Sequence, residues 1–166
     1  MIEVDKAASS LFESTGLLSD EALAGHVPAE ALLDAVDAGW MLAAEVSDRA
    51  VAGFVMASLR DRGLYVDQLS VAPEHGRQGI GRALMMHLED RAREQRIFEI
   101  TLSTFRDLPW NAPFYESLGF RHLKRSQLSA FMLDIEAAQA QFMDVSKRTF
   151  MRKRLRKTIL RSRTAG

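Results

Sequence analysis

A glycine-bearing turn stands directly before a helix-forming segment in the middle of the chain. Gly76-Arg77-Gln78-Gly79-Ile80-Gly81 is followed, after Arg82, by Ala83-Leu84-Met85-Met86-His87-Leu88. When such a turn opens a helix, several backbone N–H groups point outward together at the positive end of the helix dipole. This arrangement binds anions, and diphosphate is its usual occupant.

The residues after the turn exclude two common diphosphate sites. A dinucleotide fingerprint needs glycine or alanine three residues after Gly81, and that position is Leu84. A nucleoside-triphosphate loop needs Gly-Lys-Ser/Thr at its end, and Gly81 is followed by Arg82-Ala83. The diphosphate ligand must therefore be of another kind.

A second segment, residues 109–120, reads Pro-Trp-Asn-Ala-Pro-Phe-Tyr-Glu-Ser-Leu-Gly-Phe. In this order, with a helix and a strand between them, the two segments resemble the GNAT family of acetyl-CoA-dependent N-acetyltransferases. That family has a Gln/Arg-x-x-Gly-x-Gly/Ala loop for the pyrophosphate of coenzyme A and a later Asn…Tyr-x-x-x-Gly-Phe segment. The resemblance covers about residues 6–155.

The chain departs from the family pattern at four places. Gly76 stands in the usual Gln/Arg position of the loop, and Asn111 lies closer to Tyr115 than is usual. Ser103 stands where some ribosomal-protein acetyltransferases place a catalytic glutamate. Residues 7–12 read as helix, so the family's first strand is missing or reduced to Met1–Val4.

The resemblance implies a set of cofactor-binding residues. Backbone groups of the strand before the loop would hold the pantetheine arm and polarise the acetyl carbonyl, and the loop would hold the diphosphate. The alternative is an ordinary central strand followed by an ordinary helix start. The residues so assigned are Leu69, Ser70, Val71, Arg77, Gln78, Gly79, Ile80, Gly81, Arg82 and Asn111.

Tyr115 stands where the family places the general acid that protonates the departing thiolate. A phenol suits this task, because its usual pKa of ~10 keeps a proton available at neutral pH. The alternative is a packed helix tyrosine, since Phe114, Leu118 and Phe120 around it are apolar.

Asp67 is the candidate base. It lies four residues before Val71, where some arylalkylamine-acetylating members carry a base-like histidine. An aspartate of pKa ~4 is a poor base for an ammonium group unless burial raises that pKa. Asp67 could equally bind a cationic substrate or end a chain of water molecules, and the mechanism could need no dedicated base.

Hydrophobic periodicity predicts the elements that position these residues. After two early helices, the order is three strands, helix, strand, helix, strand, helix, strand, which indicates a mixed α/β layer architecture. The resemblance implies that the sheet is mixed, mostly antiparallel and flanked by helices. By resemblance, its central strands splay apart. Asp61-Arg62-Gly63 is expected to be a tight hairpin connection and Gly53 a bulge. We expect helices near 5–14, 29–38, 80–95, 113–118 and 128–143, and strands near 40–46, 51–59, 64–71, 97–104, 120–124 and 149–155.

Composition limits the alternatives. The 166 residues fit one domain, assigned to 1–155 with a basic tail at 156–166. The chain has no cysteine, which excludes disulfides and thiolate metal sites, and its four histidines show no metal-ligand spacing, so no metal is expected. No apolar run is long enough to span a membrane and the start is unlike a signal peptide, so we expect a cytoplasmic protein.

Nine basic residues fall between Lys147 and Arg163, whereas residues 1–146 hold thirteen basic and twenty-two acidic residues. The favoured interpretation is an edge strand protected by Lys and Arg and then a frayed tail. The alternative is a surface for an acidic partner such as RNA. Of the aromatic residues, Phe150 alone lies among these charges, which disfavours nucleic-acid binding by base stacking.

These observations predict an N-acetyltransferase that moves an acetyl group from acetyl-CoA to a primary amine by direct attack. The acceptor would be a small-molecule or peptide amine; no membrane partner is expected, and a homodimer is left open. The alternative is a non-catalytic acyl-CoA-binding or interaction module of the same fold.

Overall fold

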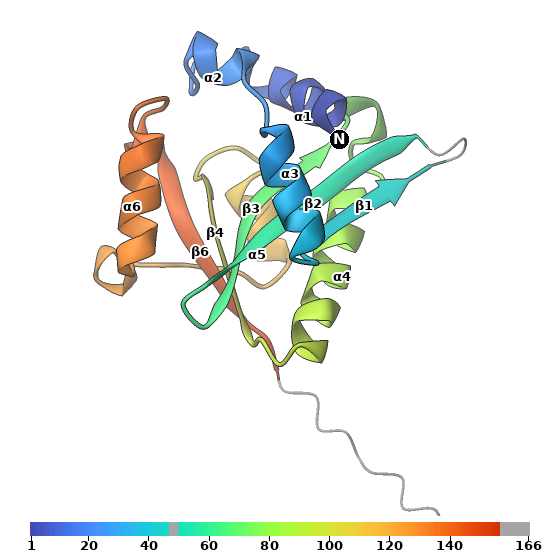
Figure 1. Ribbon diagram of the computed structural model, residues 1–166. Helices are drawn as coiled ribbons and strands as arrows, with labels where there is room; N and C mark the ends of the chain where they lie inside the picture. The colour runs from blue at the N-terminus through green and yellow to red at the C-terminus, as the bar shows by residue number, and fades with distance from the viewer. Residues whose placement is uncertain (47–49, 157–166) are drawn as a thin grey trace, which may run out of the picture.

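The computed structural model describes residues 1–46 and 50–156, so most of the predicted basic tail lies outside the described residues. The described residues form a six-stranded sheet with the order β1-β2-β3-β4-β6-β5 (Figure 1). β3 and β4 are parallel and every other pair is antiparallel, which confirms the predicted sheet. The strands are β1 (Met41–Glu45), β2 (Val51–Arg60), β3 (Gly63–Val71), β4 (Glu99–Phe105), β5 (Arg121–His122) and β6 (Arg148–Arg154).

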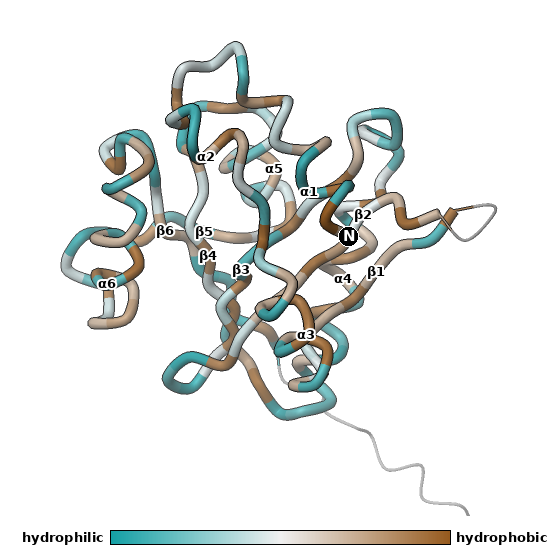
Figure 2. Tube along the Cα trace, turned by 45° about the horizontal axis from the view of Figure 1, so that its top comes forward, coloured by the Kyte–Doolittle hydropathy of each residue, from teal (hydrophilic) through white to brown (hydrophobic). Residues whose placement is uncertain are grey.

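Helices cover both faces of the sheet (Figure 1). α4 and α5 pack on one face through the core that contains Val55, Val66 and Leu102. α1 and α3 pack on the other face over β2, and α6 packs beside them over β6. Figure 2 shows the result, with mostly hydrophobic central strands and hydrophilic outer loops. The helices are α1 (Ile2–Ser9), α2 (Asp20–Ala24), α3 (Ala29–Asp37), α4 (Ile80–Glu94), α5 (Ala112–Ser117) and α6 (Ala130–Gln139).

α4 follows the predicted periodicity. Leu84, Leu88 and Ala92, spaced at four residues, are all buried against the sheet. Glu89 on the same helix is also buried, and its carboxylate is paired with Lys153 of β6 at 2.5 Å and with Arg93 at 3.3 Å. Burial of this charge is tolerated because it has two cationic partners.

β3 and β4 separate halfway along their length. Their pairing ends at Val66 and Leu102, although both strands continue beyond it. In the β2–β3 ladder the register shifts between Met56 and Ala57, which leaves Asp67 as an extra residue in β3. Such a β-bulge bends and twists its strand. The bulge therefore coincides with the opening of the predicted splay.

Within the described residues no strand precedes β1, which agrees with the first of the two predicted alternatives: residues 2–9 form α1, whose Val4 is buried against the sheet. Several predicted boundaries were wrong. The helix predicted at 5–14 thus begins earlier and continues only as a 3₁₀ turn at Ser10–Phe12. α2 was not predicted, α6 is shorter than predicted, and β5 has only two residues. The bulge expected at Gly53 lies at the adjacent residue, Ala52. Ala44 pairs with Gly53 and Glu45 pairs with Val51, so Ala52 has no partner in β1.

The interpretation of residues 149–155 as a protected edge strand was also wrong, because β6 lies between β4 and β5. Three of its basic side chains pair with acids of neighbouring elements. Lys153 reaches Glu89 of α4, and Arg152 and Arg154 lie 4.0 and 3.6 Å from Glu99 of β4. Part of the basic run therefore balances acidic residues of the fold.

Candidate active site

A cavity of about 270 Å³ lies at the opening between β3 and β4. Its walls are the diverging ends of these strands, Val66–Ser70 and Leu102–Phe105, together with Asn111, Tyr115 and Arg148. The cavity is at the small end of the size range for ligand sites, which is about 300–1,000 Å³. It is suited to a small ligand or to one end of a long one.

Two segments distant in sequence cover this cavity. Phe12, from the 3₁₀ turn after α1, lies with its ring 5.6 Å from that of Phe105. Leu18 forms a β-bridge with Met143, which follows α6. All four side chains line the cavity. The chain between α1 and α2 and the end of α6 therefore meet over the cavity and form part of its wall.

The backbone of β3 turns unpaired groups toward the opening. Ala72 N–H donates to Ala52 O at 2.9 Å, and in an antiparallel ladder every second residue bonds the same neighbour. The N–H and C=O groups of Ser70 therefore point to β2, its partner being Phe54. Those of Leu69 and Val71 point to the opposite side, where β4 has already diverged. Of the predicted residues Leu69, Ser70 and Val71, only Leu69 and Val71 therefore have backbone groups that a ligand could bind from the side of the opening.

The Ser70 side chain has another role. Its hydroxyl donates to Asp5 Oδ1 of α1 at 2.7 Å, and Gln68 Nε2 donates to the same oxygen at 2.8 Å. Asp5 Oδ2 accepts from Val27 N–H at 2.8 Å. Asp5 is buried, and these three donors satisfy its carboxylate without a cation. The network fixes α1 against the strand that carries the opening.

The tyrosine predicted as acid lies in the cavity wall. Tyr115 on α5 is buried, with its ring edge-to-face against Phe114 and Phe120 at 5.1 and 5.8 Å. Burial raises the pKa of its phenol above the usual value, and Arg148 opposes this rise. The hydroxyl has no hydrogen-bond partner among residues 1–46 and 50–156. Tyr115 thus combines a packed ring with a protonated O–H available to a ligand.

The candidate base is the bulge residue itself. Asp67 lines the cavity, and burial raises the pKa of its carboxyl, opposed by the nearby Ser58 hydroxyl and Arg60 guanidinium. The residue as a whole is nevertheless exposed to solvent, so burial of its carboxyl is only partial. A raised pKa makes the carboxylate a better proton acceptor than an ordinary aspartate.

Asn111 lies at the start of α5 and also lines the cavity. Its Nδ2 donates to Thr104 Oγ1 of β4 at 2.8 Å, which ties α5 to the diverging strand. Its Oδ1 is buried and has no partner among the described residues. A buried acceptor without a partner is costly, so this oxygen is suited to receive a donor from a ligand.

The glycine turn leads into α4, as predicted. Gly79 takes a φ of +84° at the N-cap and Arg77 a φ of +60°. No side chain caps the helix, and Ala83 N–H, bonded to Gly79 O at 2.9 Å, begins its internal hydrogen bonds. The amides of the first turn consequently have no partner within the helix. A Cβ on Gly79 would meet no atom within 4 Å, so the space above the turn is open.

The other residues of the turn are held by local contacts. Arg82 Nη2 donates to Ser117 Oγ of α5 at 2.9 Å, and Gln78 Nε2 donates to Glu74 O at 3.2 Å. A Cβ on Gly76 would lie 2.9 Å from Pro73 O. This contact explains the departure from the Gln/Arg pattern, because the backbone here leaves no space for a side chain.

Sequence reasoning missed Arg148 as a residue of this site. Its side chain lines the cavity, with Nε donating to Ser103 Oγ at 3.1 Å and Nη2 donating to Ser103 O at 2.8 Å. In the sequence it is one of nine basic residues in a run. Nothing local distinguishes the one that turns inward, because that depends on the pairing of β6 with β4.

The sheet opens between two parallel strands beside an uncapped helix start, which is the arrangement that the resemblance to GNAT acetyltransferases predicted. Residues 10–120, more than half of the chain, match the model of the Acetyltransferase (GNAT) family. The chain therefore belongs to this family, as its two motifs predicted, and acyl transfer from coenzyme A is its family-level activity.

Solved structures show the same fold. N-acetylglutamate synthase from Neisseria gonorrhoeae, complexed with coenzyme A and N-acetyl-glutamate, matches with a TM-score of 0.68 and 17% identity over 93% of this chain and 33% of that one. This chain thus spans about a third of that enzyme. The paia N-acetyltransferase from Thermoplasma acidophilum, in complex with coenzyme A, gives 0.64 and 17% over 92% and 89%. A GNAT-family acetyltransferase from Staphylococcus aureus gives 0.64 and 16% over 93% and 92%.

No helix of the described residues is long and apolar enough to cross a membrane. Within residues 1–46 and 50–156, no three His, Cys, Asp or Glu side chains are grouped so that they could hold a metal ion.

Proposed function

We propose that this protein transfers the acetyl group of acetyl-CoA to a primary amine by direct attack of the amine on the thioester. One observation carries the proposal: the unpaired edge of β3 and the partnerless hydroxyl of Tyr115 meet in one cavity. The first can align and polarise an acyl group, and the second can protonate its leaving thiolate. An acyltransferase that acts by direct attack needs both.

Two features of the chain fit acetyl-CoA as the co-substrate. The amides at the start of α4, beneath the open space at Gly79, suit the diphosphate, with Arg77 and Arg82 adding positive charge. The outward backbone groups of Leu69 and Val71 suit the extended pantetheine arm, in the manner of an added strand. An arm that follows this edge leads from α4 toward the cavity.

The chemistry requires modest help from the protein, because a thioester is already activated. The amine nitrogen forms a bond to the acetyl carbon, and the carbon–sulfur bond breaks. Backbone N–H groups of β3 would stabilise the developing oxyanion, each contributing about 3 kcal/mol in comparable enzymes. Tyr115 would give its proton to the departing thiolate, and the surplus proton of the amine would leave through water or to Asp67.

Calorimetric titration with acetyl-CoA and thiol release with a panel of amines test the proposal. We expect binding of acetyl-CoA, a rise in melting temperature by mass action, and release of free thiol that depends on an amine. Absence of heat at millimolar acetyl-CoA would refute the proposal. Binding without thiol release from any amine would instead indicate a non-catalytic acyl-CoA-binding module, which the replacement of the family's glutamate by Ser103 would favour.

A further inference from the structure

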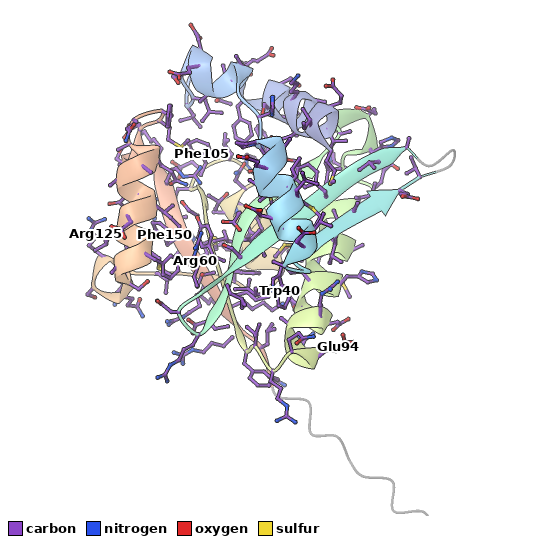
Figure 3. All side chains as sticks on the ribbon, viewed as in Figure 1. Trp40, Arg60, Glu94, Phe105, Arg125 and Phe150 are labelled. Atoms are coloured by element: carbon purple, nitrogen blue, oxygen red, sulfur yellow. The ribbon has the colours of Figure 1, made fainter. Side chains whose placement is uncertain are left out.

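Arg148 is a half-buried cation without an acidic partner among the described residues. Its guanidinium lies over the ring of Phe105 at 4.7 Å. Phe105 lies at the end of β4 that faces α1 and α2 (Figure 3). Among the described residues, no carboxylate oxygen lies within 4.0 Å of it. Burial lowers its pKa to about 10, so the group is still charged at neutral pH. A buried charge normally has a partner, as Glu89 has on the other face of the sheet.

The guanidinium has donors to spare. Arginine carries five N–H groups, and the two hydrogen bonds to Ser103 use Nε and one N–H of Nη2. The remaining N–H groups belong to a side chain that lines the cavity. Two neighbouring cations differ from Arg148 in other ways. Arg125 is paired with Glu136, and Arg106 is exposed to solvent, where water can satisfy its N–H groups, and donates to the backbone oxygen of Arg148.

The cavity wall carries two opposite charges. Of its described lining residues, Asp67 and Arg148 are the charged ones, and they do not form an ion pair with each other. Asp67 lies on β3, whereas Arg148 begins β6 beyond β4. A ligand that carries an ammonium and a carboxylate group would complement both charges at once, while a simple amine would leave Arg148 unpaired.

We propose that Arg148 binds a carboxylate of the acceptor, so that the acceptor is a free amino acid or a similarly small amino-carboxylate. This inference rests on the proposed acetyl transfer and specifies its substrate class. The carboxylate would accept from the uncommitted N–H groups of Arg148, and the amine would lie on the Asp67 side, near the edge of β3. The small cavity volume agrees with such an acceptor.

The test compares L-amino acids with their primary amides, which retain the amine and side chain but lack the negative charge. We expect wild-type protein to acetylate the best amino acid with a kcat/KM about 10- to 100-fold above that of its amide, the range for a hydrogen bond to a charged group. In Arg148→Gln this ratio should fall to near one, mainly through a higher KM for the acid. Arg148→Lys should restore part of the preference, since it keeps the charge but loses the fork geometry.

Arg152→Gln is the matched control. Arg152 lies on the same strand, pairs weakly with Glu99 and does not line the cavity. It should keep the wild-type preference for acids. An additional measurement, independent of turnover, is calorimetric titration of each acid and amide into the protein saturated with coenzyme A, where the acid should bind more tightly only while Arg148 is present.

The outcomes separate the two proposals. Wild-type protein that acetylates amides or simple amines as well as it does acids would overturn the carboxylate assignment and leave acetyl transfer intact. Retention of the acid preference in Arg148→Gln would also overturn it. If Arg148→Gln does not fold, the acid-to-amide ratio of the wild type and of Arg148→Lys still decides. Failure of acetyl-CoA to bind at all would refute the proposed function itself.

Discussion

Replacing Tyr115 with phenylalanine is the sharpest test of the proposed mechanism. The ring keeps its edge-to-face contacts with Phe114 and Phe120, and only the O–H is removed. Because this hydroxyl has no partner among the described residues, its loss leaves no buried group unpaired. We therefore expect the free energy of unfolding to change by less than about 1 kcal/mol.

The rate should respond much more strongly. A positioned general acid contributes about 10²–10⁴-fold, which corresponds to about 3–5 kcal/mol of transition-state stabilisation. Single-turnover rates with one amine, the affinity for acetyl-CoA and the melting temperature would be measured for both proteins. The expected result is a large loss of rate with little change in affinity or melting temperature.

Tyr65 provides a matched control. It is also a buried tyrosine near Arg148, but its ring packs against Phe131 of α6 and it does not line the cavity. Tyr65→Phe should therefore keep its rate within a few-fold of the wild type. If Tyr115→Phe turned over as fast as the wild type, Tyr115 would have no part in proton transfer. Equal losses in both variants would mean that packing rather than acid catalysis explains the effect.

Two further predictions concern the glycine turn and alkaline pH. Gly81→Val should weaken acetyl-CoA binding about tenfold or more in calorimetry, with little loss of stability. The reason is that a Cβ at this position lies only 3.5–3.9 Å from Phe114, Val71 and Leu69, so that a larger side chain fills the space between α4 and the β3 edge. Gly81→Ala should have a smaller effect, and unfolding without a selective loss of affinity would indicate a purely structural glycine. Burial raises the pKa of Tyr65 to about 12, and it raises that of Tyr115 too, so the folded state binds these protons more tightly than the unfolded state. The contribution of these two protons to stability is complete below pH ~10 and is lost as pH rises from there through about 12, so melting temperatures should fall across this range. Tyr65→Phe should reduce the slope of melting temperature against pH. An unchanged slope in that variant would contradict the assignment.

The sequence alone determined the features that depend on neighbouring residues. The glycine turn before α4 and the buried spacing of Leu84, Leu88 and Ala92 are local patterns, and the structure follows them closely. Tyr115 could be named because it lies at a fixed distance from Gly119-Phe120 in one short segment. Apart from the short α2, the order of strands and helices was also predictable, because each element is set by its own periodicity.

Tertiary structure decided which strands meet, and with that the composition of the site. The early end of β3–β4 pairing, the bulge at Asp67 and the insertion of β6 between β4 and β5 are pairings of distant segments, and no local pattern specifies them. The same holds for Asp5, which α1 brings to Ser70 of the strand at the opening. It holds most clearly for Arg148, one basic residue among nine in its run, which faces the cavity only because β6 aligns it opposite Phe105. Its charge is set by its own side chain, but its partial burial and its lack of an acidic partner among the described residues depend on what long-range packing places around it.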